Sequence, residues 1–535
     1  MTAAPLPTTR EDLIARLCEP ERYDLVVIGG GATGLGVALD ATLRGYSVAL
    51  VEAHDFAKGT SSRATKLVHG GVRYLAQGDI HLVREALHER LNILQGAPHL
   101  AQPLPFVMPS YKLWETPFYG IGLKVYDALA GKSGLGRTQW LTSGQAQRLL
   151  PGVQPRGLKG GVKYWDGQFD DARLALAIAR TAALHGARLA NYCAATGLLH
   201  EGGKVSGVAC RDEETGREFR LNARCVVNAT GVWVDALRQQ DAKAQGQTAG
   251  AIVAPSQGVH LVVDQSFSPG SHALLVPSTA DGRVLFAVPW LGKLILGTTD
   301  TPRQDVPLEP MPFEQEIEFI LREAGRYLRR APHRADILSQ WVGLRPLVRP
   351  SGENGSPTRA ISREHTVLVS KAGLVTVTGG KWTTYRAMAE DVLAQCTSGG
   401  LLPVRGRSRT AGQRLVGAPA QGAGAVSVSA EPGLHLYGSE AENVSLLPGR
   451  DNYLAPGLSE AMVRFAARFE YARTVEDVLA RRSRMLFLDA TKAAAAAEAV
   501  AGILADELGQ KTAESAPYSA GLTEFQALAK QYGAR

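Results

Sequence analysis

The stretch 23-YDLVVIGGGATGLGVALDATLRGYSVALVE-52 decides the fold of this chain. It starts with a short, β-branched run that is typical of a buried parallel strand, and glycines follow at once. Residues 32–44 have helical character, and residues 46–52 form a second apolar run. A strand, a helix and a second strand within about 30 residues predict a βαβ unit with a right-handed crossover.

The glycines of this unit have the spacing of a dinucleotide-binding turn. Gly29 permits the tight turn, Gly31 lets the backbone approach a pyrophosphate, and Gly34 allows the helix to pack closely on the strand. The helix N-terminus then offers free N–H groups to the phosphates. Glu52 ends the second strand, where its carboxylate can accept hydrogen bonds from ribose hydroxyls. The sequence therefore predicts that an adenine dinucleotide binds here.

One such unit binds either FAD or NAD, so the choice depends on polar segments further along the chain. The loop 60–74 carries hydroxyl groups that can hold phosphate and ribityl groups, and residues 228–233 end a strand that can approach the cofactor. Taken alone, each segment is equally consistent with ordinary turns and helix caps. The candidate cofactor contacts in these segments are Thr60, Ser61, Ser62, Lys66, Leu67, His69, Thr230 and Gly231.

The remaining chain predicts two more regions. Residues 284–290 and 293–298 are β-rich runs joined by Leu291-Gly292, which is typical of a hairpin and indicates an antiparallel sheet that caps the cofactor. Beyond this sheet the composition becomes rich in glycine, alanine and serine, and then helical. We expect an N-terminal extension (1–22), a nucleotide-binding domain (23–398) with an interleaved capping subdomain (about 252–360), a linker (399–433) and an all-α C-terminal domain (434–535).

The bulk composition excludes several classes of protein. The net charge of +7 is compatible with acidic substrates, anionic lipid or nucleic acid, but no long run of like charges indicates a nucleic-acid tail. No apolar stretch is long enough to predict a membrane-spanning helix. The cysteines are scattered without a C-x-x-C pair, which argues against a disulfide framework or a zinc site and suits a reducing cytosol. They are Cys18, Cys193, Cys210, Cys225 and Cys396.

Several sequence blocks together resemble one known family. GGGATGLG, TSSRATKLVHGGVRYL, NATGVW, GTTD, GLRPL and GGKWTTYR occur in the order seen in the FAD-dependent glycerol-3-phosphate dehydrogenases, and TVEDVLARRSRMLFLD resembles the helical domain of that family. The likeness spans about residues 23–489. It implies the FAD-binding fold of glycine oxidase and D-amino-acid oxidase, FAD as cofactor, sn-glycerol 3-phosphate as substrate, and a membrane quinone as electron acceptor.

A phosphorylated substrate of this kind requires fixed cations, preferably guanidinium groups that match phosphate oxygens. A lone arginine is usually a solvated surface residue, but the candidates here lie beside glycines, prolines or turns, and most lie inside the family-like blocks. The candidate substrate-binding residues are Arg73, Tyr74, Arg345, Arg363 and Lys381.

The expected reaction yields dihydroxyacetone phosphate and moves a hydride from C2 to flavin N5 while a base removes the hydroxyl proton. His69 is the first candidate for this base and His260 the second, because histidine titrates near neutral pH. The alternative is that His69 only forms a hydrogen bond to the flavin or to a backbone carbonyl, and the sequence leaves both roles open. Arg345 is the candidate that stabilises the forming alkoxide.

Gly380, Lys381 and Thr383 follow a predicted core strand and open a helix. The positive end of this helix can meet the negative charge that develops on reduced flavin near N1 and O2, although a plain strand-to-helix turn is the alternative. Residues 298–300 close the predicted hairpin, where an ordinary turn and a contribution to the site are equally consistent with the sequence.

Aromatic residues and lysines alternate between residues 106 and 132. This pattern is typical of a segment that rests on a membrane surface, and a core or homodimer contact is the alternative. Because the family resemblance implies a membrane quinone as acceptor, we expect a cytoplasmic protein that is attached peripherally to the inner face of the cytoplasmic membrane.

Three other functions fit parts of the sequence. An oxidase of the same fold would reduce O₂ with the same substrate. An amine oxidase is disfavoured, because it needs one carboxylate-binding arginine rather than a cluster of cations. A flavin-carrying regulatory protein without turnover would use nucleic acid as its partner, and it requires a basic stripe interleaved with aromatics that this sequence lacks.

Overall fold

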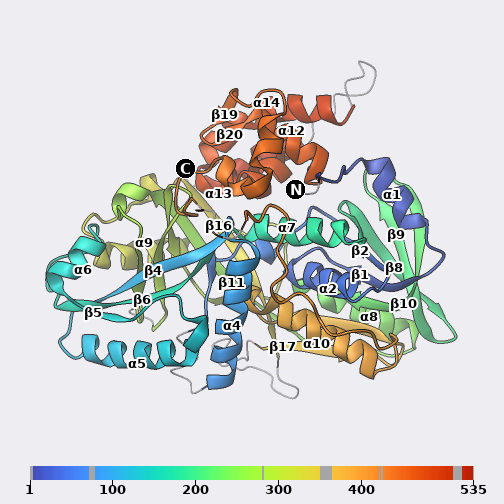
Figure 1. Cartoon of the computed structure of the whole chain (residues 1–535), viewed down its shortest axis with the longest axis horizontal. Coiled ribbons are helices and arrows are strands. Elements are labelled where there is room, and N and C mark those ends of the chain that lie inside the picture. The colour runs from blue at the N-terminus through green and yellow to red at the C-terminus, as the bar shows by residue number, and fades with distance from the viewer. Residues whose placement is uncertain are drawn as a thin grey trace.

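The computed structural model describes residues 4–71, 79–279, 282–349, 364–420, 422, 424, 426–509 and 521–533. Three parts are visible in Figure 1: a nucleotide-binding sheet on the right, a large capping sheet on the left, and a helical region above both. No helix within these ranges combines the length and apolar character needed to cross a bilayer.

The nucleotide-binding sheet contains the predicted βαβ unit. Strand β1 pairs in parallel with β2 (Leu25 beside Val48), and helix α2 connects them, so this prediction is confirmed. Strand β1 also pairs in parallel with β10, which in turn pairs with β18. The strands of this sheet are β1 (Tyr23–Ile28), β2 (Val48–Val51), β7 (Arg188–Ala190), β8 (Cys193–Glu201), β9 (Lys204–Asp212), β10 (Glu218–Asn228), β17 (His365–Val369) and β18 (Leu374–Gly379).

Helices cover this sheet and explain why its central strands are apolar throughout. Leu25, Val26 and Val27 of β1 are fully buried, as expected for a strand covered on both faces. Gly34 of α2 lies so close to the strand that a Cβ atom would come within 2.0 Å of the carbonyl oxygen of Gly29. The helices are α1 (Arg10–Cys18), α2 (Ala32–Leu43), η1 (Thr60–Ser62), α7 (Asp171–Leu184), η3 (Gly231–Trp233), α8 (Val234–Ala244), η6 (Trp382–Thr384) and α10 (Tyr385–Ser398).

The capping sheet has ten strands. The predicted hairpin is confirmed, since β13 and β14 are antiparallel and Leu291 and Gly292 between them both have positive φ (47° and 74°). The strands are β3 (Leu67–Val68), β4 (Ala101–Ser110), β5 (Gln139–Thr142), β6 (Gly160–Phe169), β11 (Val253–Asp264), β12 (Ala273–Val276), β13 (Leu285–Trp290), β14 (Lys293–Gly297), β15 (Thr301–Pro302) and β16 (Ser339–Val348).

This sheet reaches beyond the range of about 252–360 that the sequence predicts for the capping subdomain. Strands β3 to β6 come from residues 67–169, and β4 joins them to the later strands by pairing in parallel with β12. The sheet is flanked by helices α4 (Ile80–Gly96), α5 (Glu115–Ala130), η2 (Gly131–Ser133), α6 (Ser143–Leu149), η4 (Gln265–Phe267), α9 (Glu314–Tyr327) and η5 (Arg334–Asp336).

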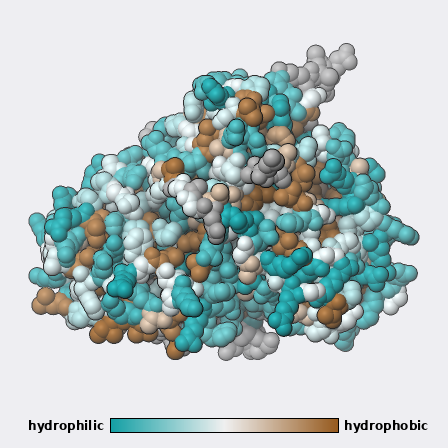
Figure 2. All heavy atoms as spheres, in the orientation of Figure 1, coloured by the Kyte–Doolittle hydropathy of each residue, from teal (hydrophilic) through white to brown (hydrophobic). Residues whose placement is uncertain are grey.

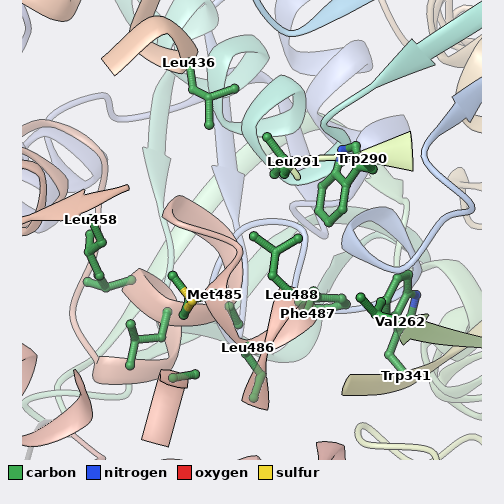
Figure 3. Packing of buried hydrophobic residues seen from close by; sticks show 14 of the residues in the cluster. Val262, Trp290, Leu291, Trp341, Leu436, Leu458, Met485, Leu486, Phe487 and Leu488 are labelled. Carbon is green, nitrogen blue, oxygen red and sulfur yellow. The ribbon is translucent and has the colours of Figure 1, made fainter. Parts of the chain in front are cut away.

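The C-terminal helical domain packs on both sheets. Phe487 contacts Trp341 of β16 edge to face at 5.0 Å, and Figure 3 shows both rings in one core with Trp290 and Val262. A shared core of this kind fixes the helices relative to the capping sheet. The elements are η7 (Leu434–Glu440), α11 (Ala441–Ser445), β19 (Tyr453–Ala455), β20 (Leu458–Ser459), α12 (Glu460–Phe469), the π-helical η8 (Asp477–Arg482), α13 (Met485–Leu488), α14 (Ala490–Glu507) and α15 (Leu522–Tyr532).

Candidate active site

The glycine turn after β1 has the geometry of a phosphate cradle. Gly29 has φ 110°, a conformation that favours glycine, and the N–H of Gly30 donates to Glu52 Oε2 at 2.6 Å. Burial raises the pKa of the Glu52 carboxyl group, against the opposing effect of the N–H groups of Gly30 and His54. A Cβ atom on Gly31 would lie 3.2 Å from Ser61 Oγ, which is a tight contact. Because glycine has no side chain, a ligand can approach the backbone at this position.

The free space and the backbone N–H donors at this turn fit an adenine dinucleotide. Gly31 precedes the first residue of α2, whose N-terminal N–H groups and positive dipole end suit a pyrophosphate. Gly231 lies at the end of the neighbouring strand with φ 63°, and a Cβ atom built on it would meet nothing within 4 Å. Thr230 beside it donates from Oγ1 to Asn228 Oδ1 at 2.8 Å. The residues present can therefore hold FAD along the carboxyl ends of β1 and β10.

The segment 55–66 crosses this site and contacts every part of it. Ser61 Oγ accepts a hydrogen bond from Ala32 N at 2.9 Å, at the start of α2. Thr60 Oγ1 donates to the carbonyl of Leu344 at 2.6 Å, and Trp382 Nε1 donates to the carbonyl of Ser61 at 2.8 Å. The segment thus joins the glycine turn, strand β16 and the turn before α10.

A cavity of about 820 Å³ lies between the capping sheet and α5. Its lining contains both polar and apolar side chains. The polar lining residues include Thr65, His69, Asp166, Thr298, Thr299, Asp300 and Arg345. The apolar lining residues include Phe106, Met108, Leu123, Leu275, Val284 and Phe286.

Arg345 lies on β16 and lines the cavity. Its Nη1 lies 3.2 Å from Asp300 Oδ1, and its Nη2 donates to the carbonyl of Thr299 at 2.9 Å. The Ser256 hydroxyl donates to the same Asp300 carboxylate and so helps to orient it. The sequence left residues 298–300 open between a turn and a site role, and the structure brings them against Arg345.

His69 follows β3 and lines the same cavity. Its backbone N–H donates to Thr383 Oγ1 at 3.3 Å, so it lies beside the turn that precedes α10. The next N–H, that of Gly70, donates to the hydroxyl of Tyr126 at 2.9 Å, and this hydroxyl donates to Asp166 Oδ2 at 2.9 Å. The loop that carries His69 is therefore held from α5 and from β6.

His260, the second candidate base, lies behind the cavity wall. Its Nε2 is 2.9 Å from Thr65 Oγ1, and its ring stacks on Trp341 at 5.1 Å. Burial lowers the pKa of His260 well below its usual range, and the positive charges of Lys66 and Arg345 lower it further. The ring is therefore neutral near pH 7, and Thr65 separates it from the cavity.

Lys66 has its ammonium group away from the cavity. Its Nζ donates to Asp171 at 2.8 Å and to the carbonyl of Ser62 at 2.7 Å, and its side chain is fully buried. Burial lowers the pKa of Lys66 to about 7, against the opposing effect of Asp171. The ammonium group is thus directed at a carboxylate, and a contact between Lys66 and a cofactor would have to come from its backbone.

Of the other predicted site residues, some are described by the structure and some lie outside the described ranges. Leu67 lines the cavity, and Gly380 (φ 71°) and Lys381 form the turn that leads into η6 and Thr383. Arg73, Tyr74 and Arg363 lie outside the described residues.

Sequence reasoning missed Thr65 and Asp166 as cavity residues and Tyr126 as the partner of Gly70. Thr65 lies within a family-like block, so closer attention to that block would have found it. Asp166 carries no motif, and only the pairing of β6 with β3 brings it near His69. Tyr126 belongs to the aromatic segment for which the sequence left a membrane contact and a core or dimer contact open, and this residue is buried, in agreement with the core alternative.

The outer face of α5 is apolar and exposed. Phe118 and Ile121 are 64% and 63% exposed, and both also line the cavity. Figure 2 shows hydrophobic residues along the lower left edge of the molecule, where Figure 1 places α5. The exposed apolar residues on and next to this helix are Leu113, Trp114, Phe118, Ile121 and Val125.

Comparisons with known proteins match the whole arrangement. Residues 24–386 match the family described as "FAD dependent oxidoreductase", and residues 383–515 match "C-terminal domain of alpha-glycerophosphate oxidase". The human protein "Glycerol-3-phosphate dehydrogenase, mitochondrial" is 42% identical over 94% of this chain and 73% of its own length. The Saccharomyces cerevisiae protein of the same name is 37% identical over 95% of this chain and 89% of its own length.

Solved structures agree with these matches. The glycerol-3-phosphate dehydrogenase from Bacillus halodurans, complexed with FAD, is 31% identical and superposes with a TM-score of 0.77, covering 98% of this chain and 97% of its own. The L-alpha-glycerophosphate oxidase from Mycoplasma pneumoniae, with FAD bound, has a TM-score of 0.55 at 16% identity over 74% of this chain and 98% of its own. At that identity the second likeness concerns the fold alone.

Proposed function

Because this chain belongs to the FAD-dependent glycerol-3-phosphate dehydrogenase family, we propose that it oxidises sn-glycerol 3-phosphate to dihydroxyacetone phosphate in the cavity lined by His69 and Arg345. FAD is the cofactor of the family and fits the cradle formed by Gly29, Gly31 and Ser61. The observation that carries the proposal is that His69 and Arg345 line one cavity, with His69 beside the turn before α10.

Each candidate residue has a distinct role in this proposal. The bound flavin supplies the redox chemistry by accepting the hydride from C2. His69 removes the proton of the C2 hydroxyl group, and Arg345 stabilises the negative charge that forms on its oxygen. Lys381, together with Arg73, Tyr74 and Arg363, binds the phosphate.

Anaerobic reduction of the bound flavin tests this proposal. Glycerol 3-phosphate should bleach the flavin absorbance, whereas glycerol and glycine at the same concentration should leave it unchanged. Glycerol controls for the alcohol without the phosphate, and glycine controls for an amine oxidase of the same fold. A flavin that is bleached by glycine and not by glycerol 3-phosphate would contradict the proposal.

We propose a membrane quinone as the acceptor of the electrons. The apolar residues of the cavity lining support this, because Phe106, Met108 and Phe286 suit contact with a lipid-soluble ring rather than with a phosphate. Rapid aerobic formation of hydrogen peroxide, with no stimulation by a short-chain quinone, would instead indicate an oxidase.

We propose further that the exposed face of α5 rests on an anionic bilayer. Lys112 lies over the ring of Trp114 at 5.8 Å and Lys124 over that of Trp140 at 5.2 Å, so cations and exposed aromatics alternate here. Apolar side chains at headgroup depth with lysines beside them match the chemistry of such a surface.

Co-sedimentation with vesicles tests the membrane contact. The protein should bind vesicles that contain anionic lipid at low salt, and a Phe118→Ser, Ile121→Ser double variant should bind them less. Unchanged binding of this variant would contradict the proposed face. A dimer in light scattering that the same variant disrupts would assign the face to a second copy of the chain instead.

A further inference from the structure

The segment 55–66 has no regular structure beyond the single turn η1, yet it forms one wall of the dinucleotide site. Its partners within the site are Ala32, Leu344 and Trp382, as described above. In addition, the N–H of Ala57 donates to the carbonyl of Gly30 at 3.0 Å. A segment without its own helix or strand depends on surrounding groups for its conformation. The question is therefore which groups hold its outer side.

Arginines of the C-terminal helical domain contact this outer side. The Asp55 carboxylate receives hydrogen bonds from both Arg481 and Arg482, including one of 2.9 Å from Arg482 Nη2. Arg484 Nη2 donates to the carbonyl of Ser62 at 2.8 Å and to Asp171 Oδ1 at 2.9 Å. These contacts lie at both ends of the stretch that contains Thr60 and Ser61.

A second set of contacts also connects the segment to the C-terminal helical domain. Lys58 pairs with Glu476 and, at 3.0 Å, with Glu309. The N–H of Ala64 donates to Asp171 Oδ2 at 2.9 Å, so Asp171 joins the segment to Arg484. Asp55, Lys58, Ser62 and Ala64 are thus each fixed through a group that belongs to or contacts the C-terminal helical domain.

Burial and backbone strain show that these arginines are strongly constrained. Arg481, Arg482 and Arg484 are at most 4% exposed. Arg484 has φ 65°, a left-handed conformation that costs a non-glycine residue free energy and persists only where its surroundings enforce it. Guanidinium groups that are this buried require carboxylate partners. Because Asp55 lies on the segment itself and Asp171 accepts a hydrogen bond from the N–H of Ala64, the ion pairs of Arg481 and Arg482 with Asp55 require the segment to be in place.

We propose that the C-terminal helical domain is a positioning element for FAD, and that Arg481, Arg482 and Arg484 hold segment 55–66 in the conformation that binds the dinucleotide. The proposal rests on FAD binding and is independent of the substrate, so its failure is distinguishable from that of the proposed reaction. The arginines act through Ser61 and its neighbours, and they are positioning rather than catalytic residues.

Reconstitution of the apoprotein with FAD tests the proposal. Arg482→Gln leaves Asp55 paired with Arg481, so the charge cluster is weakened without being abolished. We expect this variant to bind FAD at least tenfold more weakly, as measured by flavin fluorescence, and Arg482→Lys to recover part of the loss. Saturating FAD should restore kcat, and the KM for glycerol 3-phosphate should stay unchanged.

The matched control is Arg464→Gln. Arg464 pairs with Glu460 and Glu507, both at 2.5 Å, inside the same domain and away from the segment. This variant should lower the thermal midpoint of the apoprotein, because it removes ion pairs inside the same domain, and leave FAD affinity unchanged. If both variants weaken FAD binding equally, or neither does, the proposal is overturned.

Hydrogen exchange of the unaltered protein provides a second test that requires no variant. Coupling between two sites is reciprocal, so FAD that depends on the C-terminal arginines must in turn stabilise them. We expect FAD to slow amide exchange in residues 55–66 and in residues 477–488, with little change in α14. FAD that protects the first range and leaves the second unchanged would overturn the proposal even if Arg482→Gln fails to fold.

Discussion

Two groups of arginines in this protein have opposite surroundings. Arg345 is 24% exposed, borders the cavity and forms an ion pair with Asp300. Arg481, Arg482 and Arg484 are buried, and each contacts at least one carboxylate together with a further carboxylate or a backbone carbonyl. The comparison teaches that a guanidinium group that borders a cavity is suited to a ligand, whereas one enclosed by carboxylates stabilises the chain. Four tests, in order of decreasing expected effect on stability or activity, can support or contradict this distinction.

Arg484→Met should cause the largest loss. It leaves Asp171 and Asp170 buried with one cation fewer, and breaking a buried pair typically costs about 3–5 kcal/mol of folding free energy. Denaturant unfolding of the apoprotein measures this cost. A loss below about 1 kcal/mol would mean that the buried group does not stabilise the chain and would break the distinction.

Acid should weaken the same cluster. Burial raises the pKa of Glu476, but Arg481 and Lys58 outweigh it and lower the pKa to about 2. Since this folded-state value lies below the ordinary one of 4.5, the stabilisation is complete above pH 4.5 and is lost as the pH falls towards 2.

Glu476→Gln isolates this contribution, at about 1.4 kcal/mol for each unit of pKa shift. The difference in unfolding free energy between the unaltered protein and the variant should shrink between pH 5 and pH 2. Asp477 nearby has a pKa that burial raises, so its own contribution has the opposite sign and is common to both proteins. A difference that stays constant over this range would contradict the assignment.

Arg345→Ala should reduce activity with little effect on folding. Loss of a charge-assisted contact to the substrate corresponds to roughly 1.5–3 kcal/mol, about a 10- to 150-fold decrease in kcat/KM. Steady-state kinetics with glycerol 3-phosphate measure the decrease, and denaturant unfolding checks the fold. Unchanged kinetics would remove Arg345 from the site.

Arg468→Gln should have the smallest effect. Arg468 is 42% exposed and pairs with Glu507 near the surface, where solvent screens the interaction. Exposed pairs contribute about 0–1 kcal/mol, so the thermal midpoint should move by no more than a few degrees. A larger shift would show that burial is a poor guide to which arginines stabilise this chain.

The sequence predicted the parts of the fold whose signals are local. The glycine turn, the βαβ unit and the hairpin at Leu291-Gly292 each depend on residues within one short stretch. The pairing of β4 with β6 and with β12 joins segments that are far apart in the chain, so no local pattern indicated it. The partners of Arg482 and Arg484 could not be predicted for the same reason, because Asp55 and Asp171 lie 427 and 313 residues away from them in the chain.

For the candidate site, motifs indicated which blocks matter but not which atoms meet. His69 and Arg345 were chosen from separate blocks, and the structure brings both to one cavity. Lys66 belongs to the same block as His69, yet its side chain is directed at Asp171. Neighbouring residues of a strand point to opposite faces, so a motif alone cannot say which of its members reach a ligand.

The pairing of Asp55 with Arg481 and Arg482 spans more than 400 residues of chain and has a consequence for synthesis. The ribosome releases the segment 55–66 long before it makes the arginines that contact this segment. A growing chain therefore completes the wall of the flavin site only when its last helices have left the exit tunnel. Translation that stops before Arg484 would leave a product that lacks this support, however well its earlier strands had folded.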